Sequence, residues 1–146
     1  MADYEFHFSD KELRENGPRI NISIGHSEME YEESKSLGLD LPPPLTVSGL
    51  IDTGASITVI NPRVAESRRL RQTGFALVSA AGSQAQYPEY VASLKFPGTD
   101  LQSFDLVRVV GCQLPRQPIA CLIGRDILRK WLVTYNGRAS TVRISD

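Results

Sequence analysis

The stretch Leu50-Ile51-Asp52-Thr53-Gly54-Ala55-Ser56 places an acidic residue at the end of an apolar run and follows it with a small hydroxyl residue and a glycine. The run from Leu45 to Ile51 predicts a strand that holds the Asp52 carboxylate in a fixed position. Gly54 permits a tight turn with its N–H close to the acid, and the Thr53 hydroxyl is free to bond to a partner. We therefore take Asp52 as the candidate catalytic residue and Thr53, Gly54, Ala55 and Ser56 as its loop.

An Asp-Thr-Gly tripeptide alone also occurs in ordinary turns, so the residues around it matter. A second segment, Leu122-Ile123-Gly124-Arg125-Asp126-Ile127-Leu128, again joins apolar residues to a glycine and charged residues. Cys121 to Ile123 predicts a short strand, and the apolar spacing from Arg125 to Trp131 predicts a helix. At the start of that helix we expect Asp126 to interact with the helix dipole or with backbone amides.

A hairpin is predicted between these two segments. The apolar runs Phe75 to Val78 and Tyr90 to Phe96 flank the small residues Ser79 to Ser83. The tip of this hairpin comprises Ala80, Ala81, Gly82 and Ser83.

The rest of the chain also consists of short apolar segments separated by 11 glycines and 9 prolines, which predicts an all-β domain with little helix. Further strands are expected at Arg19 to Ile24 and Leu106 to Val110, and a helix is expected from Pro62 to about Arg71 after the N-cap Asn61. The polar stretch from His26 to Asp40 fits either a surface loop or an irregular helix. The end reads as a hairpin with a two-residue Asn136-Gly137 turn. We divide the chain into an N-terminal extension, 1–44, with one strand and a proline-rich segment, and a domain, 45–146.

Composition excludes several classes of protein. The 146 residues fit one domain, and 16 basic against 17 acidic residues give a formal net charge of −1, so no general attraction to nucleic acid or to an anionic membrane is expected. The sequence shows no signal peptide and no apolar run of membrane-spanning length, which predicts a cytoplasmic location. Cys112 and Cys121 are expected to be free thiols. His7 and His26 lack neighbours at metal-ligand spacing, and we expect neither a metal nor a cofactor.

The two glycine-containing motifs, in this order and with a hairpin between them, resemble the retropepsins, the retroviral-type aspartic proteases. The resemblance covers about Leu45 to Ile144. It implies a single-domain acid protease barrel with one short C-terminal helix, which forms a C2 homodimer and takes a protein or peptide substrate. It also implies that the tip, Ala80 to Ser83, is a flap that binds substrate. Gly124, Arg125 and Asp126 would then support the active-site loop.

Hydrolysis by this route needs two aspartates that share one proton around a water molecule. The chain has a single Asp-Thr-Gly, so the second carboxylate is expected from Asp52 of another copy. The sequence departs from the retroviral pattern, which often has a second aspartate where Ser56 stands here, and Arg125 must therefore find another partner. With Gly82 as the only flap glycine and a long N-terminal extension, the chain is more similar to cellular or bacterial members.

Two other classes of protein also bear on the Asp-Thr-Gly segment. The phosphate-binding loops of the sugar-kinase and actin type also follow a strand with Asp-x-Gly, but they need two large lobes, for which this chain is too short. A dimerisation or peptide-binding module on the same fold, without catalysis, stays open, because Asp52 indicates capability rather than activity.

Overall fold

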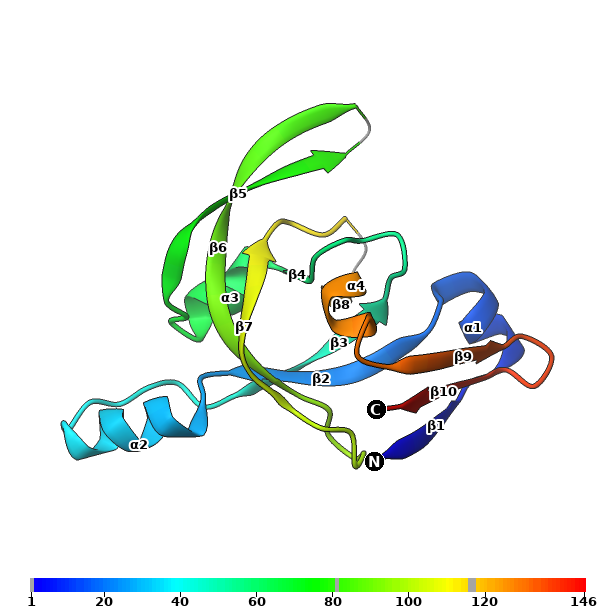
Figure 1. The fold of residues 1–146 in the computed structure, drawn as a ribbon, viewed down its shortest axis with the longest axis horizontal. Coiled ribbons are helices and arrows are strands. Elements are labelled where there is room, and N and C mark those ends of the chain that lie inside the picture. The colour runs from blue at the N-terminus through cyan, green and yellow to red at the C-terminus, as the bar shows by residue number, and fades with distance from the viewer. Residues whose placement is uncertain (1, 81, 116–117) are drawn as a thin grey trace.

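The structure is a computed structural model, and it describes residues 2–80, 82–115 and 118–146. Strands dominate the described part of the chain (Figure 1). The strands are β1 (Asp3–His7), β2 (Arg19–Gly25), β3 (Leu45–Ile51), β4 (Val59–Ile60), β5 (Gln72–Ala80), β6 (Ser83–Lys95), β7 (Phe104–Gly111), β8 (Ile119–Ile123), β9 (Leu132–Asn136) and β10 (Thr141–Ser145). The helices are α1 (Asp10–Asn16), α2 (Glu28–Ser36), α3 (Pro62–Ser67) and α4 (Arg125–Leu128).

The main sheet closes on itself. Its strand order is β2-β3-β8-β4-β7-β6-β5, and β6 also pairs with β2, so that the ring from β2 to β6 forms a barrel. The strand β5 pairs only with β6, and together they form a long hairpin that extends away from the barrel (Figure 1). Each barrel strand thus has a neighbour on both sides along part of its length, which limits unwanted strand pairing.

Two strands in this barrel position the chemistry. β3 and β8 run parallel, with Ile51 opposite Ile123 at their ends. Because parallel strands end at the same edge of a sheet, the residues that follow, Asp52 and Gly124, leave the barrel side by side. The backbone confirms this proximity, since the Asp52 N–H donates to the Ile123 carbonyl oxygen at 3.0 Å.

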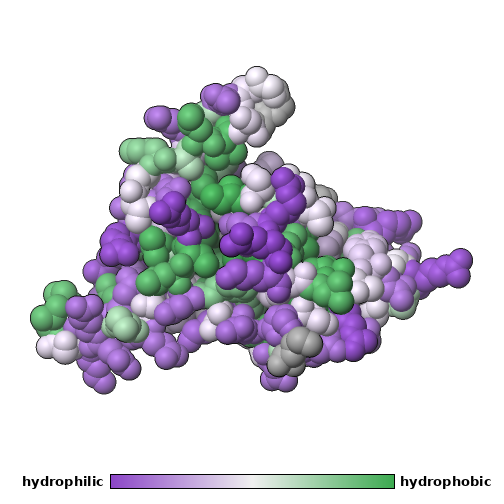
Figure 2. All heavy atoms as spheres, viewed as in Figure 1, coloured by the Kyte–Doolittle hydropathy of each residue, from purple (hydrophilic) through white to green (hydrophobic). Residues whose placement is uncertain are grey.

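The prediction of one short C-terminal helix was incomplete, because the described residues form four helices. α1 was missed, and α2 settles the choice left open for His26 to Asp40 in favour of a helix. Each buries a single residue, Leu13 and Ser34 respectively, so neither shows an apolar stripe. α2 begins with a capping box in which the Ser27 hydroxyl accepts from the Glu30 N–H and the Glu30 carboxylate accepts from the Ser27 N–H. The surface over this helix is largely hydrophilic, with a small apolar group at its outer end (Figure 2).

The other two helices are shorter than predicted. α3 ends at Ser67 rather than near Arg71, and Arg69 has a φ of 51°, in the left-handed region that ends a helix. Arg69 then donates to the Asp40 carbonyl oxygen at 2.5 Å, which ties this end to the segment after α2. α4 ends at Leu128, and the chain continues to Trp131 in turns rather than in helix.

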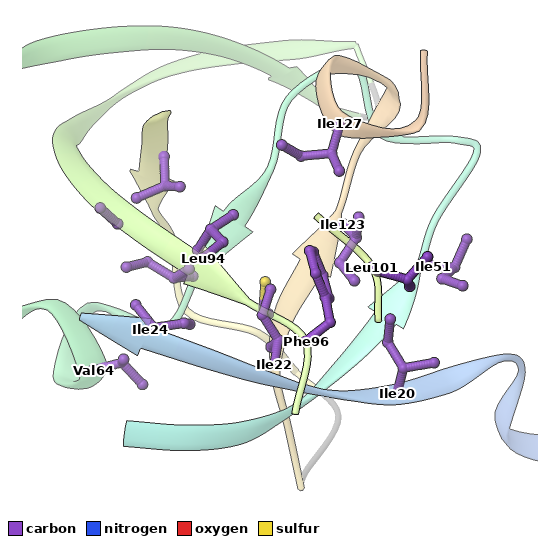
Figure 3. Close-up of a cluster of buried hydrophobic side chains, with 14 of the residues drawn as sticks. Ile20, Ile22, Ile24, Ile51, Val64, Leu94, Phe96, Leu101, Ile123 and Ile127 are labelled. Atoms are coloured by element: carbon purple, nitrogen blue, oxygen red, sulfur yellow. The ribbon is translucent and has the colours of Figure 1, made fainter. Parts of the chain in front are cut away.

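The core lies inside the barrel. Ile20, Ile22 and Ile24 of β2 are buried there and pack with Leu94 and Ile123 (Figure 3). Burying an isoleucine of this kind contributes about 1.5–3 kcal/mol. β2 precedes the boundary that we predicted at residue 44, yet it packs in the same core as the strands after it. The segment before residue 45 therefore contributes one strand, β2, to the barrel.

A smaller sheet with the order β1-β10-β9 brings the first and last strands together. The prediction of a two-residue Asn136-Gly137 turn was wrong, because Asn136 pairs with Thr141 and residues 137–140 form the connection. The Asn136 side-chain oxygen accepts from the Ala139 N–H at 3.0 Å instead, which holds this longer turn.

Within the described part of the chain, no helix has the length and apolar character needed to cross a membrane. Cys112 is half-buried and Cys121 is buried, and both are free thiols. No group of three or more His, Cys, Asp or Glu side chains among the described residues is arranged to hold a metal ion.

Candidate active site

The Asp52 carboxylate sits at the start of a tight, partly exposed turn. Asp52 Oδ1 accepts the Gly54 N–H at 2.8 Å, and the Ala55 N–H donates to the Asp52 carbonyl oxygen at 3.2 Å. A Cβ atom added at Gly54 would lie 3.1 Å from Asp52 Oδ1, so a side chain there would crowd the acid. The glycine therefore serves as hydrogen-bond donor and leaves space beside the carboxylate, as the sequence predicted.

Arg125 is tied to the same loop by its backbone and its side chain. Its N–H donates to the Ala55 carbonyl oxygen at 2.8 Å, and its guanidinium Nη1 donates to the Thr53 carbonyl oxygen at 2.6 Å. The partner that the sequence left open is thus a backbone oxygen, rather than a carboxylate at position 56. Ser56 itself is exposed.

Asp126 has its oxygens engaged by groups of its own chain. Oδ2 accepts the Thr58 N–H at 3.0 Å, and Oδ1 accepts the Thr58 hydroxyl at 2.7 Å and the Ile127 N–H at 2.9 Å. The prediction that Asp126 interacts with backbone amides is confirmed by these bonds. The carboxylate joins the start of α4 to the segment between the active-site loop and β4.

Thr58 also belongs to the candidate site, and the sequence analysis did not identify it. Its side chain is fully buried, and its hydroxyl, besides donating to Asp126, accepts the Gly124 N–H at 3.1 Å. The available signal was one hydroxyl residue inside the apolar run Ile57-Thr58-Val59-Ile60. A buried hydroxyl requires hydrogen-bond partners, and here the second motif supplies them.

Gly124 lies against the backbone of Ile57. A Cβ atom added at Gly124 would lie 2.6 Å from both the carbonyl carbon and the carbonyl oxygen of Ile57, a distance at which the backbone must move. The glycine is required here for close approach, and its φ of −88° is unstrained. The two motifs are therefore packed directly against each other.

The β5–β6 hairpin overhangs the side of the barrel that carries α4 (Figure 1). Ala80 pairs with Ser83 at its end, and Gly82 has a φ of 81°, in the region that favours glycine. Ala81, also predicted for the tip, lies outside the described residues. On one face of the hairpin, Tyr87 and its cross-strand partner Ala76 pack against a small apolar cluster that includes Val59.

The thiol nearest to this site is unsuited to nucleophilic chemistry. Burial, and secondarily the negative charge of Asp126, raises the pKa of Cys121 to about 12. A thiol with such a pKa is protonated at neutral pH and so lacks the reactive thiolate form. The Asp52 carboxylate is instead partly exposed, with Thr53 and Gly54 exposed beside it, and a carboxylate so placed is able to act as a base toward water.

Comparisons with known proteins agree with this geometry. A family model described as aspartyl protease matches residues 44–127, a range that contains the first motif and the second motif up to Ile127. The structure of EIAV protease complexed with the inhibitor HBY-793 superposes with a TM-score of 0.51 and 19% identity, covering 77% of this chain and 86% of that one. A retropepsin-like aspartic protease from Rickettsia conorii superposes with a TM-score of 0.51 and 12% identity, and the match covers 97% of this chain and 90% of that one. No curated protein sequence matches the chain.

Proposed function

The chain belongs to the aspartyl protease family, and we propose that it is an aspartic endopeptidase whose active site forms between two copies. In this proposal two Asp52 carboxylates, one from each subunit of a C2 homodimer, share a proton around one water molecule. The ionised Asp52 takes a proton from the water, which attacks the carbonyl carbon of the peptide bond, while the protonated Asp52 donates a hydrogen bond to the carbonyl oxygen.

The observation that carries this proposal is the contrast between the two aspartates of the motifs. Asp126 accepts hydrogen bonds on both oxygens from its own chain, so its carboxylate is not available as the second catalytic acid. Asp52 accepts one N–H and lies in a partly exposed turn. A second carboxylate equivalent to Asp52 is therefore best supplied by a second copy.

The neighbouring residues fit supporting roles in such a dimer. The exposed Thr53 would bond to the partner subunit across the axis, and Gly54 would contact the substrate backbone. The β5–β6 hairpin would act as a flap that closes over an extended peptide bound as an added strand. Small residues such as Ala80, Gly82 and Ser83 at its end suit a close approach to a backbone.

Mixing subunits tests this proposal. The wild-type chain should cleave a casein-like substrate or a peptide library at mildly acidic pH, and Asp52→Asn should abolish cleavage. When an excess of Asp52→Asn is added to a fixed amount of wild type, activity should fall, because mixed dimers contain a single Asp52. The exposed Asp100 provides the matched control, since Asp100→Asn should not lower the activity of the mixture.

The other outcomes are equally informative. Full cleavage by Asp52→Asn alone would contradict the mechanism, and a fully active monomer in light scattering would contradict the shared site. A dimer that binds peptides without cleaving them would favour the non-catalytic module.

A further inference from the structure

A hollow of about 360 Å³ opens beside the active-site loop, between β7 and α4. We propose that it is a specificity subsite that binds an acidic side chain of the substrate, at a position removed from the scissile bond. This inference rests on the proposed protease function and concerns which peptides that function selects.

The hollow adjoins the expected path of the substrate. Two of its lining residues adjoin Asp52 in the chain, since Ser56 ends the loop that carries Asp52 and Ile57 directly follows it. The rest of the lining comes from β7 and from the chain at and after α4. A peptide lying across Asp52 would therefore pass the mouth of the hollow, with a side chain able to enter it.

Three cations line this space. They are Arg108 of β7 and, directly after α4, Arg129 and Lys130. Figure 2 shows hydrophilic side chains gathered over α4 and toward β7 on this face. The Arg108 side chain is 78% exposed and has one acidic neighbour, Glu89, at 3.8 Å. Among the residues that the structure describes, no ion pair includes Arg129 or Lys130, so both charges are open to a ligand.

The lining contains one carboxylate, Asp126, against three cations, so an excess of positive charge remains. Thr58 and Ile127 donate hydrogen bonds to both oxygens of Asp126, which hold this carboxylate in place. The Lys130 ammonium also lies over the Phe104 ring, 5.5 Å from its centroid, which positions the charge at the wall. The hollow is thus cationic overall.

The chemistry of the lining selects a carboxylate on a short apolar stem. Guanidinium groups bind carboxylates through paired hydrogen bonds, and two of the three cations are arginines. Ile57, Val107 and Ile127 supply apolar surface for the methylene groups of a Glu or Asp side chain. A Lys or Arg side chain in the same place would be repelled.

Symmetry adds a specific expectation. A C2 dimer carries two such hollows, related by the axis that passes between the two Asp52 residues. Acidic residues should therefore be favoured on both sides of the scissile bond, at positions equally distant from it.

Matched peptides provide the test. Two fluorogenic series differ only in having Glu or Gln at one position, which is moved along the peptide. At the position that reaches the hollow, kcat/KM should be about two- to five-fold higher for Glu, the range for one exposed ion pair, and higher when several cations engage. Arg129→Glu should remove or reverse this preference. Lys35→Glu is the control, because it makes the same charge change on α2, which projects away from the barrel (Figure 1), and it should leave the preference intact.

The possible results separate the two proposals. Equal cleavage of Glu and Gln peptides at every position would overturn the subsite and leave the protease standing. If wild type cleaves neither series, the protease proposal fails, and the subsite is judged by fluorescence anisotropy on the same peptides with Asp52→Asn. Tighter binding of Glu peptides that Arg129→Glu abolishes would support it, and binding without charge preference, or none, would overturn it.

Discussion

Thr58 and Asp126 are joined by two hydrogen bonds although they lie 68 positions apart in the sequence. The Thr58 N–H and hydroxyl donate to separate oxygens of the Asp126 carboxylate, at 3.0 and 2.7 Å. This pair connects the segment after the Asp52 loop to α4. It therefore couples the fold of the barrel to the position of the candidate catalytic residue.

Replacing Asp126 should destabilise the protein. Asp126→Ala leaves the buried Thr58 hydroxyl and two N–H groups without their acceptor, at a cost of about 2–4 kcal/mol in the free energy of unfolding. Asp126→Asn should cost less, because its side-chain oxygen still accepts part of the network. Urea denaturation measures both. The exposed Asp105 offers a control, and Asp105→Ala should change stability by less than about 0.5 kcal/mol. Equal stability of Asp126→Ala and wild type would show that these hydrogen bonds contribute nothing to the free energy of unfolding.

Gly124→Ala should disturb both the barrel and the loop. The added methyl would lie 2.6 Å from the Ile57 backbone, and relieving such overpacking costs about 1–3 kcal/mol or more. Gly137→Ala is the matched control, since its Cβ would find Tyr135 at 3.5 Å, an ordinary contact. Thermal unfolding of both variants checks this, and protease activity should fall in the first alone. A Gly124→Ala variant as stable as Gly137→Ala would contradict the close packing.

Much of the barrel could be predicted from local patterns. The strand Leu45–Ile51 was predicted with its observed bounds, because a mainly apolar run ends at the charged Asp52. The helices α1 and α2 could not be found from apolar periodicity, since each buries one residue. Their signal was in the caps, where Ser9 and Ser27 each precede a glutamate by three positions.

Part of the candidate site could be predicted from the sequence. The Gly54 N–H beside Asp52 and the bonding of Asp126 to backbone amides were predicted, whereas Thr58 was missed. The sequence identified Asp52, Arg125 and Asp126 because their motifs are continuous in the chain. It could not predict that Arg125 donates to the Thr53 carbonyl, or that Thr58 meets Asp126. These contacts arise from the pairing of β8 with β3 and with β4, respectively. Pairing between strands distant in sequence is set by packing of the whole core, which no local pattern encodes.

The last residue, Asp146, should contribute stability near neutral pH that is lost in acid. Hydrogen bonds from the backbone N–H groups of Gln102 and Ala2 hold the pKa of the Asp146 side chain below its ordinary value. A carboxylate with a lowered pKa in the folded state stabilises the protein above its unfolded pKa, near 4, and this contribution disappears as pH falls through the folded value. Asp146→Asn should therefore lower stability near neutral pH and show a shallower loss below about pH 4. Denaturation curves at several pH values test this, and parallel pH profiles for both proteins would contradict it.

The two thiols should differ in reactivity. The raised pKa of Cys121, about 12, together with its complete burial, leaves almost no accessible thiolate in the native protein. Cys112 is half-buried and should react with iodoacetamide first. Mass spectrometry of the native protein should show one modified thiol, and both should react after denaturation. Modification of Cys121 at the rate of Cys112 in native buffer would mean that the β8 region opens readily.

Arg125 should support the Asp52 loop through the shape of its guanidinium group and not through its charge alone. Its guanidinium reaches the Thr53 carbonyl at 2.6 Å while its backbone bonds to Ala55, so the side chain holds the turn that follows Asp52. Arg125→Lys keeps the charge but loses the planar fork, and a bond to a charged group is worth about 1.5–3 kcal/mol. We expect kcat to fall by about ten-fold or more, with a smaller change in KM, because substrate contacts remain while the Asp52 loop loses its support. Arg63→Lys on the exposed face of α3 is the control and should behave as wild type. An Arg125→Lys variant with unchanged kcat would show that the loop keeps its shape without this side chain.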